Sequence, residues 1–182
     1  MNGNIVPRAY SSASIAMHWL MLLFLAGVYL CIELHESFPK GSDTREALKS
    51  WHFTLGLSVF ALVWLRLVFR LRHKTPAIVP PPPAWQNLLA KVMHVALYGL
   101  MIGMPMGGWL MLSAAGKPVP FWGLELPALI AENEATAKWI KGIHETVGEV
   151  GLYLIGLHTV AALYHHYFKK DNALARMLPN RR

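Results

Sequence analysis

Histidine is the residue best suited to metal chemistry in this chain, which has nine histidines among 182 residues. Two of them, His144 and His158, are fourteen residues apart in the nearly uncharged stretch 142–167. On a helix this spacing returns to within about 40° of the same face and separates the two rings by about 21 Å along the axis. In a bilayer with a hydrocarbon core about 30 Å thick, one imidazole would lie toward each surface. Two stacked haems would need ligands at this spacing.

The other residue types of this chain argue against a different kind of metal centre. The single cysteine, Cys31, falls inside an apolar run, which excludes an intramolecular disulfide and a thiolate cluster. No Asp or Glu lies in the middle of an apolar run to form a proton relay. Haem iron between two imidazoles fits what remains, and such iron has no open position for oxygen or substrate. The chemistry expected is therefore outer-sphere electron transfer.

Composition indicates a membrane protein, because 54% of the residues are hydrophobic, 15% are charged and the mean hydropathy is +0.35. We expect an all-α, four-transmembrane-helix bundle that forms a single domain over residues 1–182. A basic residue, Arg8, precedes the first apolar run as in a signal peptide, but the run is long and no cleavage site follows, so we expect a retained helix. The four expected helices are residues 14–32, 52–71, 88–112 and 143–167.

The distribution of basic residues predicts that both termini are cytoplasmic. The same distribution explains the net charge of +7 by topology and contact with anionic lipid, without nucleic acid. Of the 17 lysines and arginines, six lie on the predicted outer side and eleven on the inner side, the latter being Arg8, Arg66, Arg70, Arg72, Lys74, Lys91, Lys169, Lys170, Arg176, Arg181 and Arg182.

This orientation assigns a depth to each membrane histidine. The outer layer has one pair, His52 with His144, whereas the inner layer offers His18, His94 and His158 for one pair. Histidines in membrane helices also serve as hydrogen-bonding groups between helices, but five of them at two matched depths favour ligation. A glycine follows each outer histidine by four residues, which leaves a gap for a porphyrin on the same helical face.

Residues at the two ends of this predicted path suggest what it connects. Lys49, Lys138 and Lys141 precede the outer histidines, and a local positive patch would attract small anions. The alternative is that these lysines neutralise haem propionates or anchor the helices at the interface. At the inner end, the histidine left over from ligation would hydrogen-bond a quinone carbonyl, and we assign this role to His94.

Four motifs resemble the prokaryotic cytochrome b(561) family, and the similarity runs from Tyr10 to the C-terminus. The resemblance implies two haem b groups in a multi-pass protein of the bacterial inner membrane. By analogy with related cytochrome b subunits of formate dehydrogenase and nickel-iron hydrogenase, it also implies that His18 pairs with His158 and His52 with His144. The motifs are A-M-H-W at His18, K-S-W-H at His52, H-E-T-V-G at His144, and I-G-L-H-T-V-A-A-L-Y-H-H-Y-F-K-K-D-N-A-L-A-R-M-L-P around His158.

Within this family, the chain resembles the members that act as superoxide oxidases. These pass electrons from periplasmic superoxide to ubiquinone and produce oxygen and ubiquinol. The resemblance implies this activity here, with Lys49, Lys138 and Lys141 steering the anion and His94 lining the quinone site. Two alternatives are a haem-bearing anchor subunit that relays electrons between a periplasmic dehydrogenase or hydrogenase and the quinone pool, and a transporter or scaffold without cofactor. The expected partners are superoxide, ubiquinone and membrane lipid, with a monomer and a docked redox protein both left open.

Overall fold

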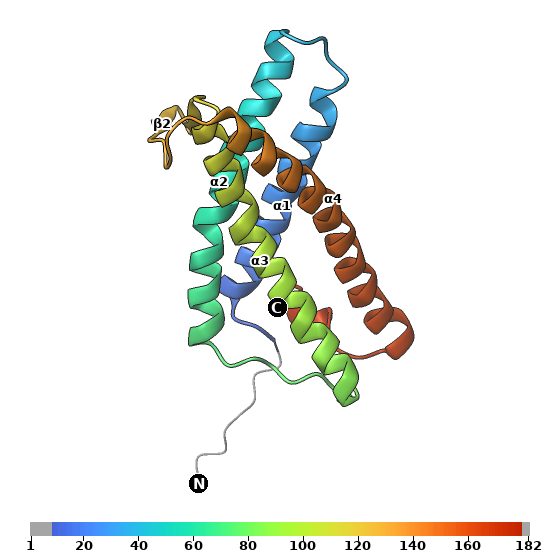
Figure 1. The fold of residues 1–182 in the computed structure, drawn as a ribbon. Helices are drawn as coiled ribbons and strands as arrows, with labels where there is room; N and C mark the ends of the chain where they lie inside the picture. The colour runs from blue at the N-terminus through green and yellow to red at the C-terminus, as the bar shows by residue number, and fades with distance from the viewer. Residues whose placement is uncertain (1–8, 180–182) are drawn as a thin grey trace.

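Four long helices dominate the fold (Figure 1), as seen in a computed structural model that describes residues 9–179. They are α1 (Ser12–His35), α2 (Asp43–Arg72), α3 (Ala84–Ala114) and α4 (Glu134–Tyr164). Each contains an apolar segment long enough to cross a membrane. Helix α1 packs mainly on α2 and α3 mainly on α4, while α2 and α3 join the two pairs. The expected four-helix membrane bundle is confirmed.

The helices are longer than the apolar runs predicted, most of all at the starts of α2 and α4, which both begin nine residues earlier. Side-chain caps set these starts: the side chain of Ser42 accepts a hydrogen bond from the Arg45 amide and that of Asn133 from the Thr136 amide. Hydropathy identifies the part of a helix that lies in lipid, so it misses polar turns that extend beyond the membrane.

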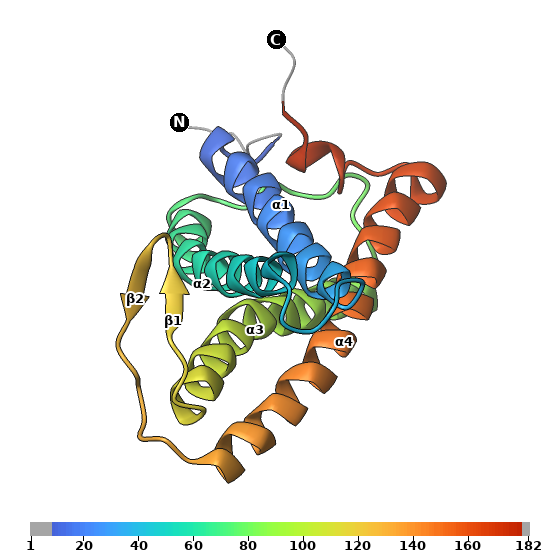
Figure 2. The ribbon, with the colours of Figure 1, turned by 90° about the horizontal axis from the view of Figure 1, so that it is seen from above.

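The segment between α3 and α4, expected as a long loop, contains a β-hairpin of β1 (Val119–Phe121) and β2 (Leu124–Leu126) beside α2 (Figure 2). Both residues of its turn, Trp122 and Gly123, have positive φ, as in the two-residue turns that suit hairpins. The Trp122 indole donates a hydrogen bond to Ser58 on α2 over 3.0 Å. The hairpin therefore packs against the half of α2 that carries His52.

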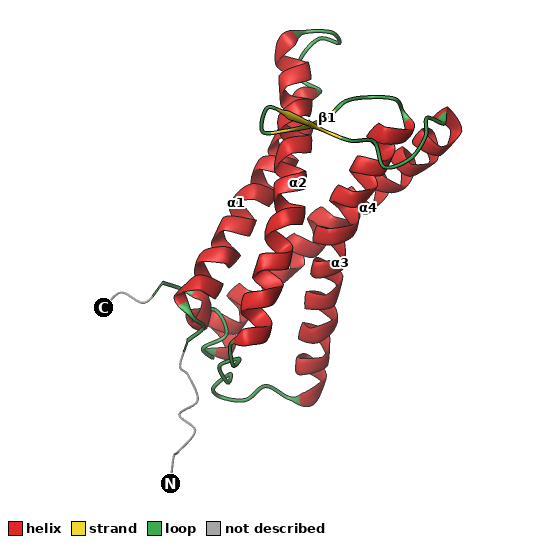
Figure 3. Ribbon diagram, turned by 90° about the vertical axis from the view of Figure 1, so that its left-hand side faces the viewer, coloured by secondary structure: helices red, strands yellow, loops and turns green. Residues whose placement is uncertain are grey.

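At the opposite end of the bundle lie residues 9–11, the loop between α2 and α3, and the described segment after α4 (Figure 3). The Tyr10 amide donates to the Arg176 carbonyl over 3.2 Å, and Asn172 exchanges hydrogen bonds with the Val79 backbone. Arg176 is buried and donates to the Pro76 carbonyl, and burial lowers the pKa of its guanidinium. These contacts place the three segments at one end, as the charge distribution predicts.

Following the predicted orientation, we call this end the inner end and the hairpin end the outer end. That the inner end faces the cytoplasm stays a prediction. Three of the basic residues that support it, Arg8, Arg181 and Arg182, lie outside the described residues.

The protein core is small, as expected where lipid replaces water around the bundle. Its central cluster consists of Met21, Val59, Val63 and Met101, contributed by α1, α2 and α3. Many large apolar side chains elsewhere on the helices are exposed, including Leu71 at 76%. Such a surface would be unfavourable in water but is suited to a bilayer.

Candidate haem-binding sites

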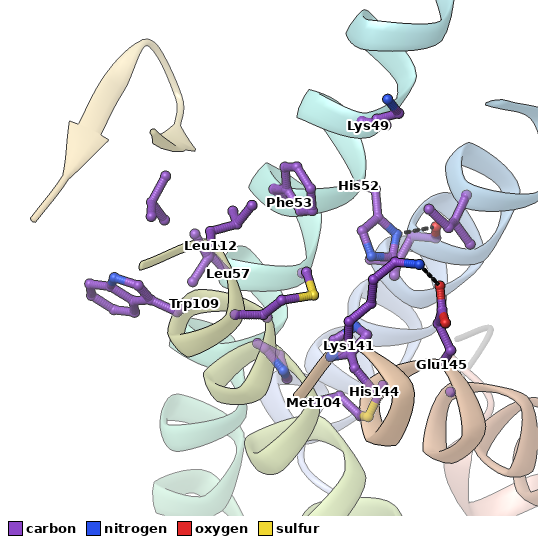
Figure 4. Close-up of a pocket in the computed structure, with 18 of the residues that line it drawn as sticks. Lys49, His52, Phe53, Leu57, Met104, Trp109, Leu112, Lys141, His144 and Glu145 are labelled. Atoms are coloured by element: carbon purple, nitrogen blue, oxygen red, sulfur yellow. Dashed lines mark hydrogen bonds and ion pairs between the residues drawn. The ribbon is translucent and has the colours of Figure 1, made fainter. Parts of the chain in front are cut away.

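The outer histidines face one another across the space between α2 and α4 (Figure 4). The ring centroids of His52 and His144 are 6.4 Å apart, and the ring planes are inclined at 75°. Nδ1 of His52 lies 2.9 Å from the Val28 carbonyl oxygen on α1, to which it donates as the protonated nitrogen, so Nε2 of His52 is left for a ligand. Nδ1 of His144 is buried without a hydrogen-bond partner among the described residues. This nitrogen lies beside Gly107 and Gly108 on α3, and with the proton on Nδ1 the Nε2 atom of His144 would be free to coordinate.

The inner histidines form a second cluster, contributed by α1, α3 and α4. His18 and His158 have ring centroids 6.4 Å apart, and His94 lies closer to His158, at 5.4 Å. A fourth polar side chain joins them, because Nη2 of Arg66 lies 3.1 Å from Nδ1 of His18. The structure thus brings together all three inner histidines that the sequence singles out.

These distances test whether a haem iron fits between the rings. A coordinating imidazole nitrogen lies about 2 Å from its metal and about 1.2 Å from its own ring centre, so two axial rings have centres about 6.4 Å apart. The pairs His52–His144 and His18–His158 both have this separation, whereas His94 and His158 are about 1 Å too close. The ring separations are compatible with an axial pair at each depth and agree with the pairing that leaves His94 free. Nδ1 of His18 accepts from Arg66, so ligation through its Nε2 would require the proton to lie on Nδ1 and this contact to open.

A cavity of about 1670 Å³ adjoins the outer pair and is lined largely by apolar side chains (Figure 4). Beside His52, a Cβ added at Gly56 would meet no atom within 4 Å, so the predicted gap is present. Beside His144, the gap is bounded by the Met104 side chain, 3.4 Å from a Cβ added at Gly148. Among residues 9–179, no group of three or more His, Cys, Asp or Glu side chains is arranged to hold one metal ion. A large apolar cavity with two facing imidazoles fits a porphyrin better than a bare ion.

The three lysines predicted at the outer end do lie at the edge of this cavity, but each is paired with a carboxylate. Lys49 bonds Glu46 at 2.6 Å, and Lys138 and Lys141 each bond a glutamate at 2.8 Å. Around the cavity, the five basic side chains are Arg45, Lys49, Lys117, Lys138 and Lys141, and the seven acidic ones are Glu33, Glu36, Glu46, Glu132, Glu134, Glu145 and Glu149. The positive charges predicted to attract an anion are therefore locally compensated.

Sequence reasoning did not single out the partners that hold the outer site together. The Tyr29 hydroxyl donates to the Gly148 carbonyl over 2.8 Å and joins α1 to α4. The Val28 carbonyl orients His52. Tyr29 could have been found as a polar group at the depth of Gly148, but no side-chain pattern reveals which backbone carbonyl a histidine will reach.

A four-helix membrane bundle with facing histidines at two depths belongs to the class of membrane cytochromes b. The family model of prokaryotic cytochrome b561 matches residues 9–180, and the chain belongs to this family. It is therefore a multi-pass bacterial membrane protein of electron transfer, and the family implies b-type haem.

Curated relatives cover nearly the whole chain. Cytochrome b561 homolog 1 of Escherichia coli (strain K12) is 40% identical over 173 residues, which are 95% of this chain and 98% of the relative. The probable superoxide oxidase CybB of Yersinia pestis is 35% identical over 175 residues, 96% and 98% of the two chains. Cytochrome b561 homolog 2 of E. coli is 27% identical over 173 residues, 94% and 92% of the two chains.

Proposed function

We propose that this protein is a di-haem cytochrome b of the bacterial inner membrane that oxidises periplasmic superoxide and reduces ubiquinone. Two superoxide anions each lose one electron and leave as oxygen, and ubiquinone takes up two electrons and two protons to give ubiquinol. The observation that carries the proposal is the equal 6.4 Å separation of two facing histidine pairs. Superoxide as donor is supported by a relative of 35% identity that is named a probable superoxide oxidase.

In this proposal the four ligands hold and orient the two haems. His52 and His144 bind the outer group, and His18 and His158 bind the inner one. Haem iron with two axial imidazoles supplies reversible one-electron transfer without an open coordination position. Because α4 contributes one ligand to each site, this single helix fixes their separation. The apolar side chains that line much of the cavity beside the outer pair suit the face of a porphyrin.

His94 is the candidate contact for ubiquinone. It is exposed on the bundle surface, where a quinone dissolved in lipid can reach it. Its Nδ1 lies 2.5 Å from the Ala90 carbonyl and donates to it, so Nε2 is the acceptor. A neutral imidazole in this tautomer accepts a hydrogen bond from a quinol hydroxyl. His94 would therefore stabilise the reduced product beside the inner pair.

The test combines a visible spectrum with a superoxide assay on the purified protein. We expect two haems per chain, and rapid reduction of both when an enzymatic superoxide source is added in the absence of quinone. Added water-soluble ubiquinone should then reoxidise them. A colourless protein would contradict both cytochrome functions. Haem reduction no faster than in an unrelated bis-histidine cytochrome would contradict superoxide as donor.

The acidic surplus around the outer cavity favours a second candidate, a membrane relay subunit. Seven carboxylates against five basic groups suit the docking of a basic protein surface better than the capture of a free anion. In that case, the protein would co-purify with a larger periplasmic dehydrogenase or hydrogenase and show little activity alone. Mild detergent extraction followed by size-exclusion chromatography distinguishes the two candidates.

A further inference from the structure

Arg66 occupies the position on α2 that corresponds to His158 on α4. It follows His52 by fourteen residues, as His158 follows His144, and so it reaches the depth of the inner site. Its guanidinium lies between α1 and α3, with Nη2 3.1 Å from Nδ1 of His18 and its carbon 6.0 Å from the centre of the Tyr98 ring. The side chain is thus directed into the bundle and does not extend to the headgroups.

Among residues 9–179, the positive charge of Arg66 has no acidic partner. None of the four ion pairs among residues 9–179 involves it, and its Nη1 is buried without a hydrogen-bond partner there. The acidic residue at the inner end, Asp171, accepts hydrogen bonds from His165 and from the Ala173 amide. An unpaired guanidinium within a membrane bundle is costly, so its placement indicates an anionic group that the inner site receives.

The outer site has no equivalent of this charge. There, the partner of His52 is the neutral Val28 carbonyl, and Lys49, Lys138 and Lys141 at the cavity edge are paired with carboxylates. The other two basic side chains of the cavity, Arg45 and Lys117, form no hydrogen bond with His52 or His144 among the described residues. The two histidine pairs have the same ring separation but differ in the charge beside them. A positive charge next to a redox centre favours its reduced form.

We propose that Arg66 is the positioning residue that raises the reduction potential of the inner haem above that of the outer one. Its free Nη1 would donate a hydrogen bond to a haem carboxylate, and its charge would favour the ferrous state. This inference rests on the proposed function, since it requires a haem at each histidine pair. It gives electron transfer a direction, from the outer end of the bundle to the inner end.

The experiment is a redox titration of the purified wild-type protein and three variants, followed in the visible spectrum. In Arg66→Gln, we expect the reduction potential of one haem to fall by at least about 59 mV. For a one-electron step, this is a tenfold shift of the equilibrium toward the ferric form. The other potential should not change. In Arg66→Lys, which keeps the charge, most of the wild-type value should remain. A His52→Ala background, expected to retain the inner haem alone, assigns the shifted potential.

Arg70→Gln is the matched control, because it removes the same charge one turn further along α2. Arg70 is exposed, bonds Thr75 and lies 5.7 Å from the Tyr10 ring centre, although its charge also acts on His94. We expect the inner potential to shift by less than half as much as in Arg66→Gln, because solvent screens the exposed charge of Arg70. An equal shift in both variants would overturn the specific role of Arg66.

Each outcome separates this inference from the proposed function. Two haems with unchanged potentials in Arg66→Gln would overturn the role of Arg66 and leave the proposed function standing. A wild-type protein without haem would overturn the proposed function itself. If Arg66→Gln loses the inner haem, Arg66→Lys decides: retention of the haem at the wild-type potential supports the charge role, and loss of the haem in both variants overturns it.

Discussion

His52 on α2 is tied to the Val28 carbonyl on α1 by a hydrogen bond of 2.9 Å from its Nδ1. The bond joins two helices and fixes the orientation of the imidazole. A ligand ring held in this way presents its second nitrogen at a constant position, which is how outer-shell hydrogen bonds tune metal sites in general. His144 has no such partner, so the orientation of the outer pair depends mainly on His52.

The first prediction concerns this ring. His52→Ala should reduce the haem content from two to one per chain, because a single axial imidazole at a membrane site would bind haem weakly. The measurement is the haem-to-protein ratio of the purified variant. His73→Ala is the control: His73 lies at the C-terminal end of α2, bonds the Phe69 carbonyl and is not among the residues that line the outer cavity. Equal haem content in both variants would contradict ligation by His52.

At the inner site, the second prediction separates a ligand from its neighbour. His18→Ala should lose one haem, whereas His94→Ala should keep both, because the His94 ring is too close to His158 to share a metal with it. We expect His94→Ala to raise the KM for a water-soluble ubiquinone several-fold and to leave superoxide-driven haem reduction unchanged. Loss of a haem in His94→Ala with retention of both in His18→Ala would reverse the assignment.

Charge at the cavity edge is the subject of the third prediction. Lys141 and Glu145 form a 2.8 Å ion pair on α4, next to His144. If the lysine steers superoxide, Lys141→Gln should slow the second-order reduction by about twofold to tenfold at low ionic strength, and Glu145→Gln should accelerate it. Added salt should reduce both effects. Two unchanged rates in stopped-flow measurements would show that the pair has an anchoring role instead.

Much of the fold was predictable because the thickness of the bilayer sets the length of each apolar run and because basic residues are more frequent on its cytoplasmic side. The four spans and the grouping of three polar segments at one end follow from these quantities alone. The hairpin at Val119–Leu126 did not follow, because its strands are short and its turn, Trp122-Gly123, lacks the usual Asn or Asp. Helix starts at Ser42 and Asn133 were missed because a cap is set by local backbone geometry.

In the candidate site too, features set by regular helix geometry were predictable, and features set by contacts between helices were not. Spacing along one helix was sufficient to predict that His144 and His158 share a face, since helix geometry is regular. It left three candidates at the inner depth. The family resemblance implies that His18 is the partner of His158, and the ring separations agree with this proposed pairing. The pairing of Lys49 with Glu46 was not foreseen, although a spacing of three residues on a helix permits it.

Close packing between α1, α3 and α4 gives the fourth prediction. A Cβ added at Gly151 would lie 2.7 Å from Leu100 and 2.8 Å from the Tyr29 hydroxyl, which bonds Gly148. Gly151→Ala should therefore destabilise the bundle by about 1–3 kcal/mol through overpacking. At Gly142, a Cβ would meet nothing within 4 Å, so Gly142→Ala should stabilise α4 by up to about 1 kcal/mol. Thermal unfolding in detergent, followed through the haem spectrum, checks both, and equal effects would contradict the packing described.

The fifth prediction tests the inner end and the orientation of the bundle together. The Asn172 side chain accepts a hydrogen bond from the Val79 amide at 2.8 Å and donates to the Ala77 carbonyl at 3.3 Å. Asn172→Ala removes both bonds, at a cost of about 1–3 kcal/mol, and should expose the loop between α2 and α3 to proteolysis. Asn87→Ala removes one exposed bond to Pro82 and serves as the control.

Limited trypsin digestion of membrane vesicles of known sidedness provides the measurement. In inside-out vesicles, we expect faster cleavage after Arg72 or Lys74 in Asn172→Ala than in the wild type or Asn87→Ala. In right-side-out vesicles, all three proteins should resist cleavage at these positions, because the basic residues of this loop predict a cytoplasmic location. Rapid cleavage from the periplasmic side would reverse the orientation. The pair His52 and His144 would then face the cytoplasm, and superoxide generated in the periplasm could not reach it.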